Sequence, residues 1–430
     1  MDVLKSTTTL FFSFFVITIQ KKIHRIYHRK GGEIMCNIYY ADHSATTYVK
    51  EEVLAEMLPY FHKYFGNASS HYSIGIKSKE ALDKARCKVA TAIGARSDEI
   101  YFTSGGSEAD NMILAGIATK YQYKGKHIIT SKIEHKAILN TCHMLEKEGF
   151  EVTYLEVDEK GFIKIDQLLK AIKEETILIS IMFANNEIGT IQDIETIGNI
   201  AKENNIFFHT DAVQAIGNIP IDVHKLNIDL LSLSAHKFYG PKGVGCAYMK
   251  RGIEIIPLIH GGHQEFSKRA GTENVAGIVG LSKAIEIATN EKNIQEYNQK
   301  LLLYRNTFID IVKKELTGIR INGSLTNRLA GNVNLSIQGI DSQTLLAMLN
   351  MEGICASSGS ACNSNEVKPS HVLMAIGLDP ITANSTLRFT FGDSNTLEDI
   401  EVMAYKLVEI VKKLRMTKNH IVSMKSNPPY

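Results

Sequence analysis

One lysine, in a short polar turn, is the residue of this sequence best suited to covalent chemistry. Lys237 lies in the segment Ser234-Ala235-His236-Lys237-Phe238-Tyr239-Gly240-Pro241. A Gly-Pro pair so close behind the lysine ends any regular helix or strand, so we expect Lys237 in a loop. Taken alone, this segment fits an ordinary surface lysine equally well.

A carboxylate in a neighbouring segment favours a more specific interpretation. The strand-like run 206–210 ends at Asp211, and Gln214 follows it. Pyridoxal 5′-phosphate (PLP) needs a lysine that binds it as a Schiff base. It also needs a carboxylate that keeps the pyridine nitrogen protonated, so that the ring withdraws electrons. Lys237 and Asp211 together predict a PLP site.

The glycine-rich string Ser104-Gly105-Gly106-Ser107 could hold the phosphate of that cofactor. It stands between an expected strand and an expected helix, where glycines allow close approach and free N–H groups attract an anion. Such a string by itself is also what a simple strand-to-helix turn requires.

Several strings together resemble the cysteine desulfurases of the NifS/IscS branch, within the class V, fold-type I aminotransferase superfamily. The resemblance covers about residues 38–413, and its strings run in the family's order: Asp42–Thr47, Phe65–Ser70, Phe102–Asn111, Glu134-His135, Asn185–Gly189, Asp211–Gln214, Ser234–Lys237, Ser357–Cys362 and Arg388-Phe389.

The resemblance implies roles for the residues around the cofactor. It assigns the phosphate to Gly106, Ser107, Ser234 and His236, and the phenolic oxygen of PLP to Gln214. Thr272 resembles the threonine that reaches the phosphate of a neighbouring subunit, which implies a homodimer.

Two further parts of the resemblance concern the substrate. His135 would stack on the PLP ring and exchange protons, although fifteen histidines make a hydrogen-bonded loop histidine a common alternative. Asn186 and Arg388 would hold the substrate carboxylate, since a guanidinium offers it a bidentate fork. An outward-facing arginine is the alternative for Arg388.

Cys362 decides between members of the superfamily. It lies in Ala356-Ser357-Ser358-Gly359-Ser360-Ala361-Cys362, a run of small residues typical of an exposed loop. Its thiolate could attack the sulfur of bound cysteine, whereas Cys355 adjoins an apolar stretch and is expected to be structural. Without the motif, an incidental loop thiol would be a fair interpretation. Asn363 departs from the threonine usual in the family.

The resemblance implies conversion of L-cysteine to L-alanine, with a persulfide left on Cys362. The sulfur would pass to an acceptor protein such as an iron–sulfur scaffold or a thiolation protein. An aminotransferase or selenocysteine lyase is the rival enzyme, but an aminotransferase needs no loop cysteine. A non-catalytic binding protein is the other rival, and the joint presence of Lys237, Asp211 and His135 argues against it.

Composition restricts the remaining choices. A chain of 430 residues is too long for one simple core, so two lobes are expected. A net charge of +2 gives no reason to expect direct nucleic-acid binding. The six cysteines, at 36, 87, 142, 246, 355 and 362, show no zinc-site spacing, so no metal is expected. Scattered thiols suggest a reducing compartment, and a cytoplasmic enzyme is expected.

The first 34 residues stand apart from the rest. An apolar run at 9–19 is followed by a basic run at 21–30, and the apolar part is short for a membrane span. Gly31-Gly32-Glu33 can be encoded by a ribosome-binding sequence just before Met35. Translation of upstream sequence from a misassigned start is therefore our first hypothesis, and a membrane anchor is the second.

Alternating strand and helix patterns predict an α/β fold, and the resemblance implies PLP-dependent fold type I. We expect a large domain over 50–290 with a mostly parallel, seven-stranded type of sheet, and a tail over 416–430. A smaller α+β domain would comprise 291–415, and the resemblance adds 35–49 to it. Expected strands are 99–103, 127–131, 151–155, 176–183, 206–210, 230–233, 245–249, 332–337 and 386–391. Expected helices are 51–64, 71–93, a helix starting near 107, 137–148, 165–174, 194–204, a long one from 286, 342–351, 370–376 and 396–413.

Overall fold

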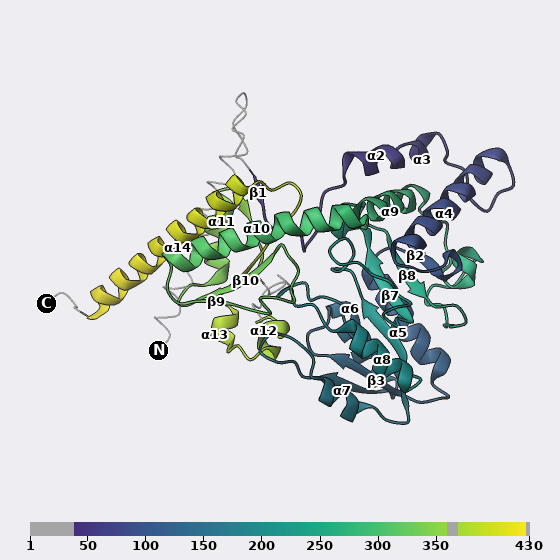
Figure 1. The fold of residues 1–430 in the computed structure, drawn as a ribbon, viewed down its shortest axis with the longest axis horizontal. Coiled ribbons are helices and arrows are strands. Elements are labelled where there is room, and N and C mark those ends of the chain that lie inside the picture. Colours follow the sequence, from purple (N-terminus) through teal and green to yellow (C-terminus); the bar gives the residue numbers. More distant parts are fainter. Residues whose placement is uncertain (1–37, 359–368, 427–430) are drawn as a thin grey trace, which may run out of the picture.

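A computed structural model describes residues 38–358 and 369–426 (Figure 1). The hypotheses about residues 1–34 and about Cys362 therefore fall outside the described residues. Among the helices that are described, none combines the length and the apolar character needed to cross a bilayer.

A seven-stranded sheet forms the centre of the larger lobe. Its strand order is β2-β8-β7-β6-β5-β3-β4, and all neighbours are parallel except β8, which is antiparallel to β2 and β7. The expected mostly parallel sheet is thus confirmed. The strands are β2 (Ile100–Thr103), β3 (His127–Ser131), β4 (Glu151–Leu155), β5 (Thr176–Ser180), β6 (Phe207–Asp211), β7 (Leu230–Ser234) and β8 (Gly245–Met249).

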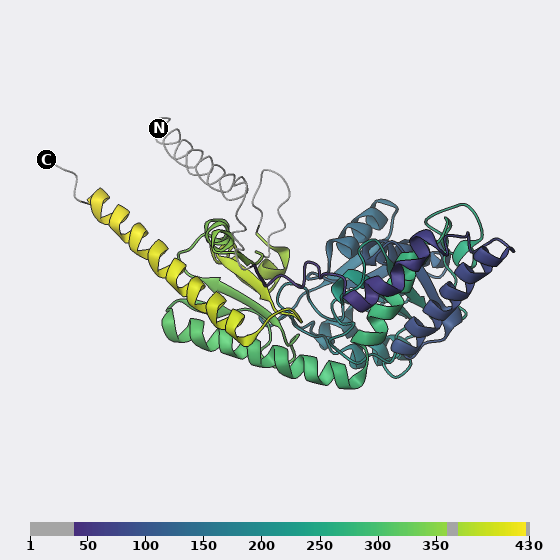
Figure 2. The ribbon, with the colours of Figure 1, turned by 90° about the horizontal axis from the view of Figure 1, so that it is seen from above.

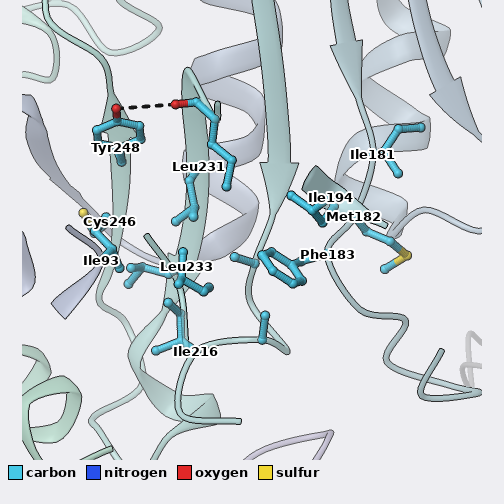
Figure 3. Packing of buried hydrophobic residues seen from close by; sticks show 14 of the residues in the cluster. Ile93, Ile181, Met182, Phe183, Ile194, Ile216, Leu231, Leu233, Cys246 and Tyr248 are labelled. Carbon is cyan, nitrogen blue, oxygen red and sulfur yellow. Dashed lines mark hydrogen bonds between the residues drawn. The ribbon is translucent and has the colours of Figure 1, made fainter. Parts of the chain in front are cut away.

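Both faces of this sheet are covered by helices, which is why its central strands β5, β6 and β7 are buried at almost every position. Successive residues point to opposite faces, so Ile128 packs in one core and Ile129 in the other. Figure 3 shows part of one core, where Leu231 and Leu233 lie among side chains from neighbouring elements. The covering helices are α4 (Ser73–Ala92), α5 (Gly106–Tyr121), α6 (Lys136–Lys147), α7 (Ile165–Ala171), α8 (Ile194–Glu203) and α9 (Val275–Ala288).

A second lobe has its own antiparallel sheet, in the order β12-β10-β9, and its own apolar core. Figure 2 shows it beside the first lobe, with α10 running along it. Tyr39 and Ala41, from the start of the described chain, belong to this core. Its elements are β1 (Tyr39–Tyr40), α10 (Glu291–Glu315), β9 (Ile319–Ile321), β10 (Asn332–Ile337), α11 (Ser342–Met351), β11 (Ile354–Cys355), α12 (His371–Ala375), α13 (Pro380–Ala383), β12 (Thr386–Thr390) and α14 (Leu397–Ser426).

The helices differ most from the expected ones at three places, and other ends shift by up to three residues, as where α7 ends at Ala171 and not at 174. The helix expected over 51–64 is two helices, α2 (Glu51–Met57) and α3 (Pro59–His62), because Pro59 has no N–H to continue the first. The helix expected from 286 is the end of α9 followed by α10, which begins anew where the Asn290 side chain accepts a hydrogen bond from the Asn293 N–H. The helix expected over 396–413 continues as α14 to Ser426.

Candidate active site

A cavity of about 240 Å³ opens where β6 and β7 of the large sheet end. Ligands of open α/β sheets gather at this edge, outside the carboxyl ends of the strands. The lining contains most of the residues singled out in the sequence: Gly106, Ser107, His135, Asn186, Asp211, Gln214, Ser234, His236 and Lys237. Segments up to 131 residues apart in the chain thus meet at one site, as residues 106 and 237 show.

Lys237 ends a short 3-10 turn that follows β7 directly, and its side chain is partly buried. Its Nζ donates hydrogen bonds to the backbone oxygens of Ser44, at 2.6 Å, and Ala45, at 2.7 Å. Burial lowers the pKa of Lys237 to about 8, and the charge of Arg388 adds to this. A lysine with this pKa is partly neutral, and so nucleophilic and basic, near neutral pH.

Asp211 stands at the last position of β6, buried within the site. Its Oδ1 accepts a hydrogen bond from the Val213 N–H at 2.9 Å. Burial raises the pKa of Asp211, whereas the interaction with His135, the hydrogen bond from Val213 and the charge of Lys237 oppose that rise. A buried carboxylate of this kind requires a cationic partner in the cavity to remain charged at low cost.

A second carboxylate, Asp110, lies beside Asp211 and was not expected. It is on α5, only 1% exposed, and its Oδ1 has no hydrogen-bond partner. The Nε2 atom of His209 is 3.8 Å from that oxygen. Burial, followed by the charge of Asp211, raises the pKa of Asp110 well above its ordinary value. Burial and the neighbouring Asp211 thus both favour the protonated form of Asp110.

One end of the cavity is formed by the N-terminus of α5. Gly106 is the first residue of this helix, whose first N–H groups have no partner within the helix. A Cβ atom at Gly106 would lie 2.6 Å from Cγ2 of Val213, so only glycine fits there. The helix dipole, the free amides and the neighbouring Ser107 and Ser234 suit an anion.

His236 and His135 bring two imidazoles to the same cavity. The Nδ1 atom of His236 is 3.1 Å from the Thr46 hydroxyl, and burial together with Lys237 and Lys242 lowers the pKa of His236 to about 4. The Nδ1 atom of His135 accepts from the Ala137 N–H and caps α6. Desolvation within the site lowers the pKa of His135, against the attraction of Asp211. The His236 ring is therefore neutral at neutral pH.

Arg388 points inward from β12, and the outward-facing alternative is wrong. The residue is 6% exposed. Its guanidinium donates to the backbone oxygen of Asn186 at 3.0 Å and to Oδ1 of Asp42 at 2.7 Å. The Asp42 contact is an ion pair that had not been anticipated. Arg388 and Asn186 are thus adjacent, as expected for two parts of a carboxylate clamp.

Arg388 and Thr272 are expected site residues that do not line this cavity. Thr272 is exposed, in a loop anchored by the ion pair between Arg269 and Glu108 of α5, at 2.8 Å. Cys362 is outside the described residues. The backbone of Ser357, five positions earlier, pairs with that of Arg388, so the segment that leads to Cys362 starts beside the clamp.

The residues of this cavity fit PLP. Within the described residues, the hydrogen-bond donor to buried Asp211 is the neutral Val213 N–H, and a protonated pyridine nitrogen would supply a cationic partner. The cradle at Gly106 would be filled by a Cβ atom. Lys237 supplies the amine, and His135 lines the same space. The donor set therefore matches an aldehyde, a pyridinium and a phosphate in one ligand.

Comparisons with known proteins agree with this chemistry. The family model "Aminotransferase class-V" matches residues 39–403. A curated relative named cysteine desulfurase IscS, from Methanosarcina thermophila, is 57% identical over 376 residues, which cover 87% of this chain and 92% of the relative. The protein of the same name from Clostridium botulinum is 56% identical over 87% of this chain and 95% of its own length.

Two solved structures are similar to this chain over most of its length. A structure titled "NIFS-LIKE PROTEIN" superimposes with a TM-score of 0.82 at 39% identity, covering 87% of this chain and 99% of the other. One titled "SspA in complex with cysteine" does so with a TM-score of 0.73 at 40% identity, over 83% of this chain and 99% of that one.

Proposed function

The chain belongs to the class V aminotransferase family and is a cysteine desulfurase, and we propose that it uses PLP held through Lys237 and keeps the sulfur on Cys362. The observation that best supports this proposal is the meeting of Lys237, Asp211 and the N-terminus of α5 in one cavity. A lone lysine or a lone glycine turn would not distinguish a PLP site from an ordinary loop.

The proposed cofactor contacts follow from the lining. Lys237 would bind PLP covalently, Asp211 would pair with its ring nitrogen and Gln214 with its phenolic oxygen, and His135 would stack on the ring. Gly106, Ser107, Ser234 and His236 would hold the phosphate. When bound, PLP supplies an electron sink that stabilises negative charge on the substrate.

Lys237 is also the proposed base. The free amine has a place to rest, because the Ser44 and Ala45 carbonyls accept hydrogen bonds from it. Burial lowers its pKa to about 8, so a useful fraction is neutral and can take the proton from the substrate Cα. His135, whose ring is held by the Ala137 N–H, would exchange a proton with the substrate.

Arg388 and Asn186 are the proposed clamp for the carboxylate of L-cysteine. The guanidinium is buried and its Nε atom has no partner, so a donor remains available. The clamp would hold the substrate so that Lys237 can remove its Cα proton.

Cys362 is the proposed nucleophile. Its thiolate attacks the substrate sulfur; an S–S bond forms and the C–S bond breaks. The substrate carbon keeps the bonding pair and takes a proton, so L-alanine leaves. The persulfide on Cys362 would then pass to an acceptor protein, such as an iron–sulfur scaffold or a thiolation protein. The free thiols of Cys87, Cys142, Cys246 and Cys355 suit a reducing compartment, and we propose the cytoplasm.

A homodimer is proposed from an apolar surface near Thr272. Phe266 is 58% exposed, in a left-handed turn that the buried Arg86–Glu265 ion pair holds in place. Phe61 and Phe65, also largely exposed, follow α2 on the same lobe. Aromatic residues are enriched in protein–protein contacts, so exposed side chains of this size support the proposal. Thr272 lies in the neighbouring loop and would reach the phosphate site of the second copy.

Borohydride reduction of the PLP-loaded protein tests the proposal. Reduction should fix the cofactor on the peptide that contains Lys237, as seen by peptide mass spectrometry. Lys237→Ala should lose the label and the yellow colour. Lys242→Ala, five residues further on in the same turn region and exposed, is the matched control and should keep both. Label on another lysine would refute the assignment.

A further inference from the structure

The guanidinium of Arg388 already has a carboxylate partner in the protein itself. Oδ1 of Asp42 is 2.7 Å from its Nη2 atom, and the two side chains are 19% and 8% exposed. Within the described part of the chain, Asp42 is the residue that forms an ion pair with Arg388. This matters because Arg388 is the cation proposed to receive the substrate carboxylate.

The backbone around Asp42 keeps this contact in place. Asp42 pairs with Thr390, two residues beyond Arg388 in β12, so its carboxylate starts from a fixed position. Its carbonyl oxygen accepts hydrogen bonds from the Ala45 N–H, at 2.9 Å, and from the Tyr40 hydroxyl, at 3.0 Å. The resulting turn also presents the carbonyls of Ser44 and Ala45 to Lys237. A single turn therefore contacts both cations of the site.

We propose that Asp42 is an internal competitor that occupies, on Arg388, a position needed by the carboxylate of the incoming amino acid. This inference rests on the proposed clamp role of Arg388. Asp42 thereby sets the affinity for amino-acid ligands, and it keeps the buried guanidinium paired while no substrate is bound.

The donors of Arg388 support this role. A guanidinium has five N–H groups in a planar fork, and a bidentate ligand uses two parallel ones. One Nη1 hydrogen goes to the Asn186 carbonyl, and Nη2 goes to Asp42. The guanidinium can bind a carboxylate in a bidentate way through Nη1 and Nη2 or through Nε and Nη2. Both pairs include Nη2, so a bidentate substrate carboxylate would lie next to Asp42. Two carboxylates at such a distance repel, so one of them has to withdraw.

The charge state of Asp42 fits the same role. Burial raises the pKa of Asp42, while Arg388 and then Lys237 lower it. Loss of the guanidinium to a substrate would remove the larger of these two stabilising charges. A competitor that is only partly buried can be displaced, whereas a fully buried ion pair would be too costly to break.

Asp42→Asn tests the proposal because it removes the charge and keeps the shape. Binding of L-alanine, the reaction product, to the PLP-loaded protein is measured by isothermal titration calorimetry. We expect Asp42→Asn to bind L-alanine about three- to tenfold more tightly, as removal of a part-buried competing ion pair would allow. The affinity for ethylamine, which lacks the carboxylate, should stay the same. The KM for L-cysteine should fall in parallel.

Asp393→Asn is the matched control. Asp393 is also in the small lobe, and its carboxylate forms an ion pair with Lys50 at 2.7 Å. This substitution should leave the affinity for L-alanine unchanged. The visible absorbance of the bound cofactor and the melting temperature check that Asp42→Asn is folded, and Asp42→Ser serves as a second variant should the first fail to fold.

The outcomes separate this inference from the proposed function. If Arg388→Gln leaves L-alanine binding unchanged, the clamp itself is wrong. If Arg388→Gln abolishes binding while Asp42→Asn weakens it, Asp42 orients the arginine and does not compete. Unchanged binding in Asp42→Asn, with the clamp intact, would also overturn the competition.

Discussion

The lowered pKa of Lys237 makes a quantitative prediction about the reactivity of its amine in the cofactor-free protein. Burial is the main cause of the low value, and Arg388 contributes, whereas Asp42 and Asp211 oppose it. Reactivity towards an electrophile depends on the neutral fraction of the amine, so it should rise with pH and level off above a pH of about 8.

The expected magnitude follows from the two pKa values. With a pKa of about 8, roughly 9% of the amine is neutral at pH 7, against about 0.03% for the ordinary value of 10.5, a ratio of about 300. The same difference corresponds to about 3 kcal/mol. Because the unfolded chain binds the extra proton between these two values, the cofactor-free protein should gain stability as the pH rises from about 8 towards 10.5.

Competitive acetylation measures this directly. Trace acetic anhydride is added to the cofactor-free protein between pH 6 and 11, and the label on the Lys237 peptide is quantified by mass spectrometry. Two variants give opposite signs: Arg388→Gln should move the midpoint upward, and Asp211→Asn should move it downward. A Lys237 profile that is still rising steeply at pH 10 would refute the reasoning.

Three further predictions concern single side chains. Asp211→Asn should keep the fold and bind PLP, but the rate of alanine formation should fall by orders of magnitude because the ring loses its charged partner; near-normal turnover would contradict the role. Glu265→Gln breaks the buried pair with Arg86 and should cost about 3–5 kcal/mol in the free energy of unfolding, measured in urea; a loss below about 1 kcal/mol would show that the pair contributes little. Gly106→Ala places a Cβ atom 2.6 Å from Val213 and should weaken PLP binding at least tenfold by fluorescence titration, whereas unchanged affinity would exclude a tight cradle there.

Much of the fold was accessible from the sequence because hydrophobic periodicity and turn residues report directly on regular elements. Several strands, including β3 (His127–Ser131), β4 (Glu151–Leu155) and β10 (Asn332–Ile337), lie where the pattern indicated. The break at Pro59 could have been anticipated from the missing N–H. The start of α9 at Val275 was missed because its run is apolar on nearly every face and lacks helical periodicity. Asn274 was a signal for it, since its side chain caps the helix by accepting a hydrogen bond from the Gly277 N–H.

The site was predictable where one short segment carries its own chemistry, as at Lys237 and Asp211. Asp42 was not predicted to pair with Arg388, because 346 residues separate them and only the folded chain brings them together. Asp110 did leave a signal, since it is a carboxylate between Ala109 and Ile113 on a face that is otherwise apolar. The carbonyls of Ser44 and Ala45 leave none, because backbone acceptors are the same in every residue.

The identity of the sulfur-carrying cysteine is the central claim, and mass spectrometry of the intact enzyme after incubation with L-cysteine tests it most directly. The account predicts a mass increase of one sulfur, about 32 Da, that maps to the Cys362 peptide and is lost in Cys362→Ala, which should still bind PLP and L-cysteine. Cys355→Ala should retain both the persulfide and the rate of alanine formation. A persulfide on Cys355, or alanine and sulfide formed at the wild-type rate by Cys362→Ala, would contradict the account.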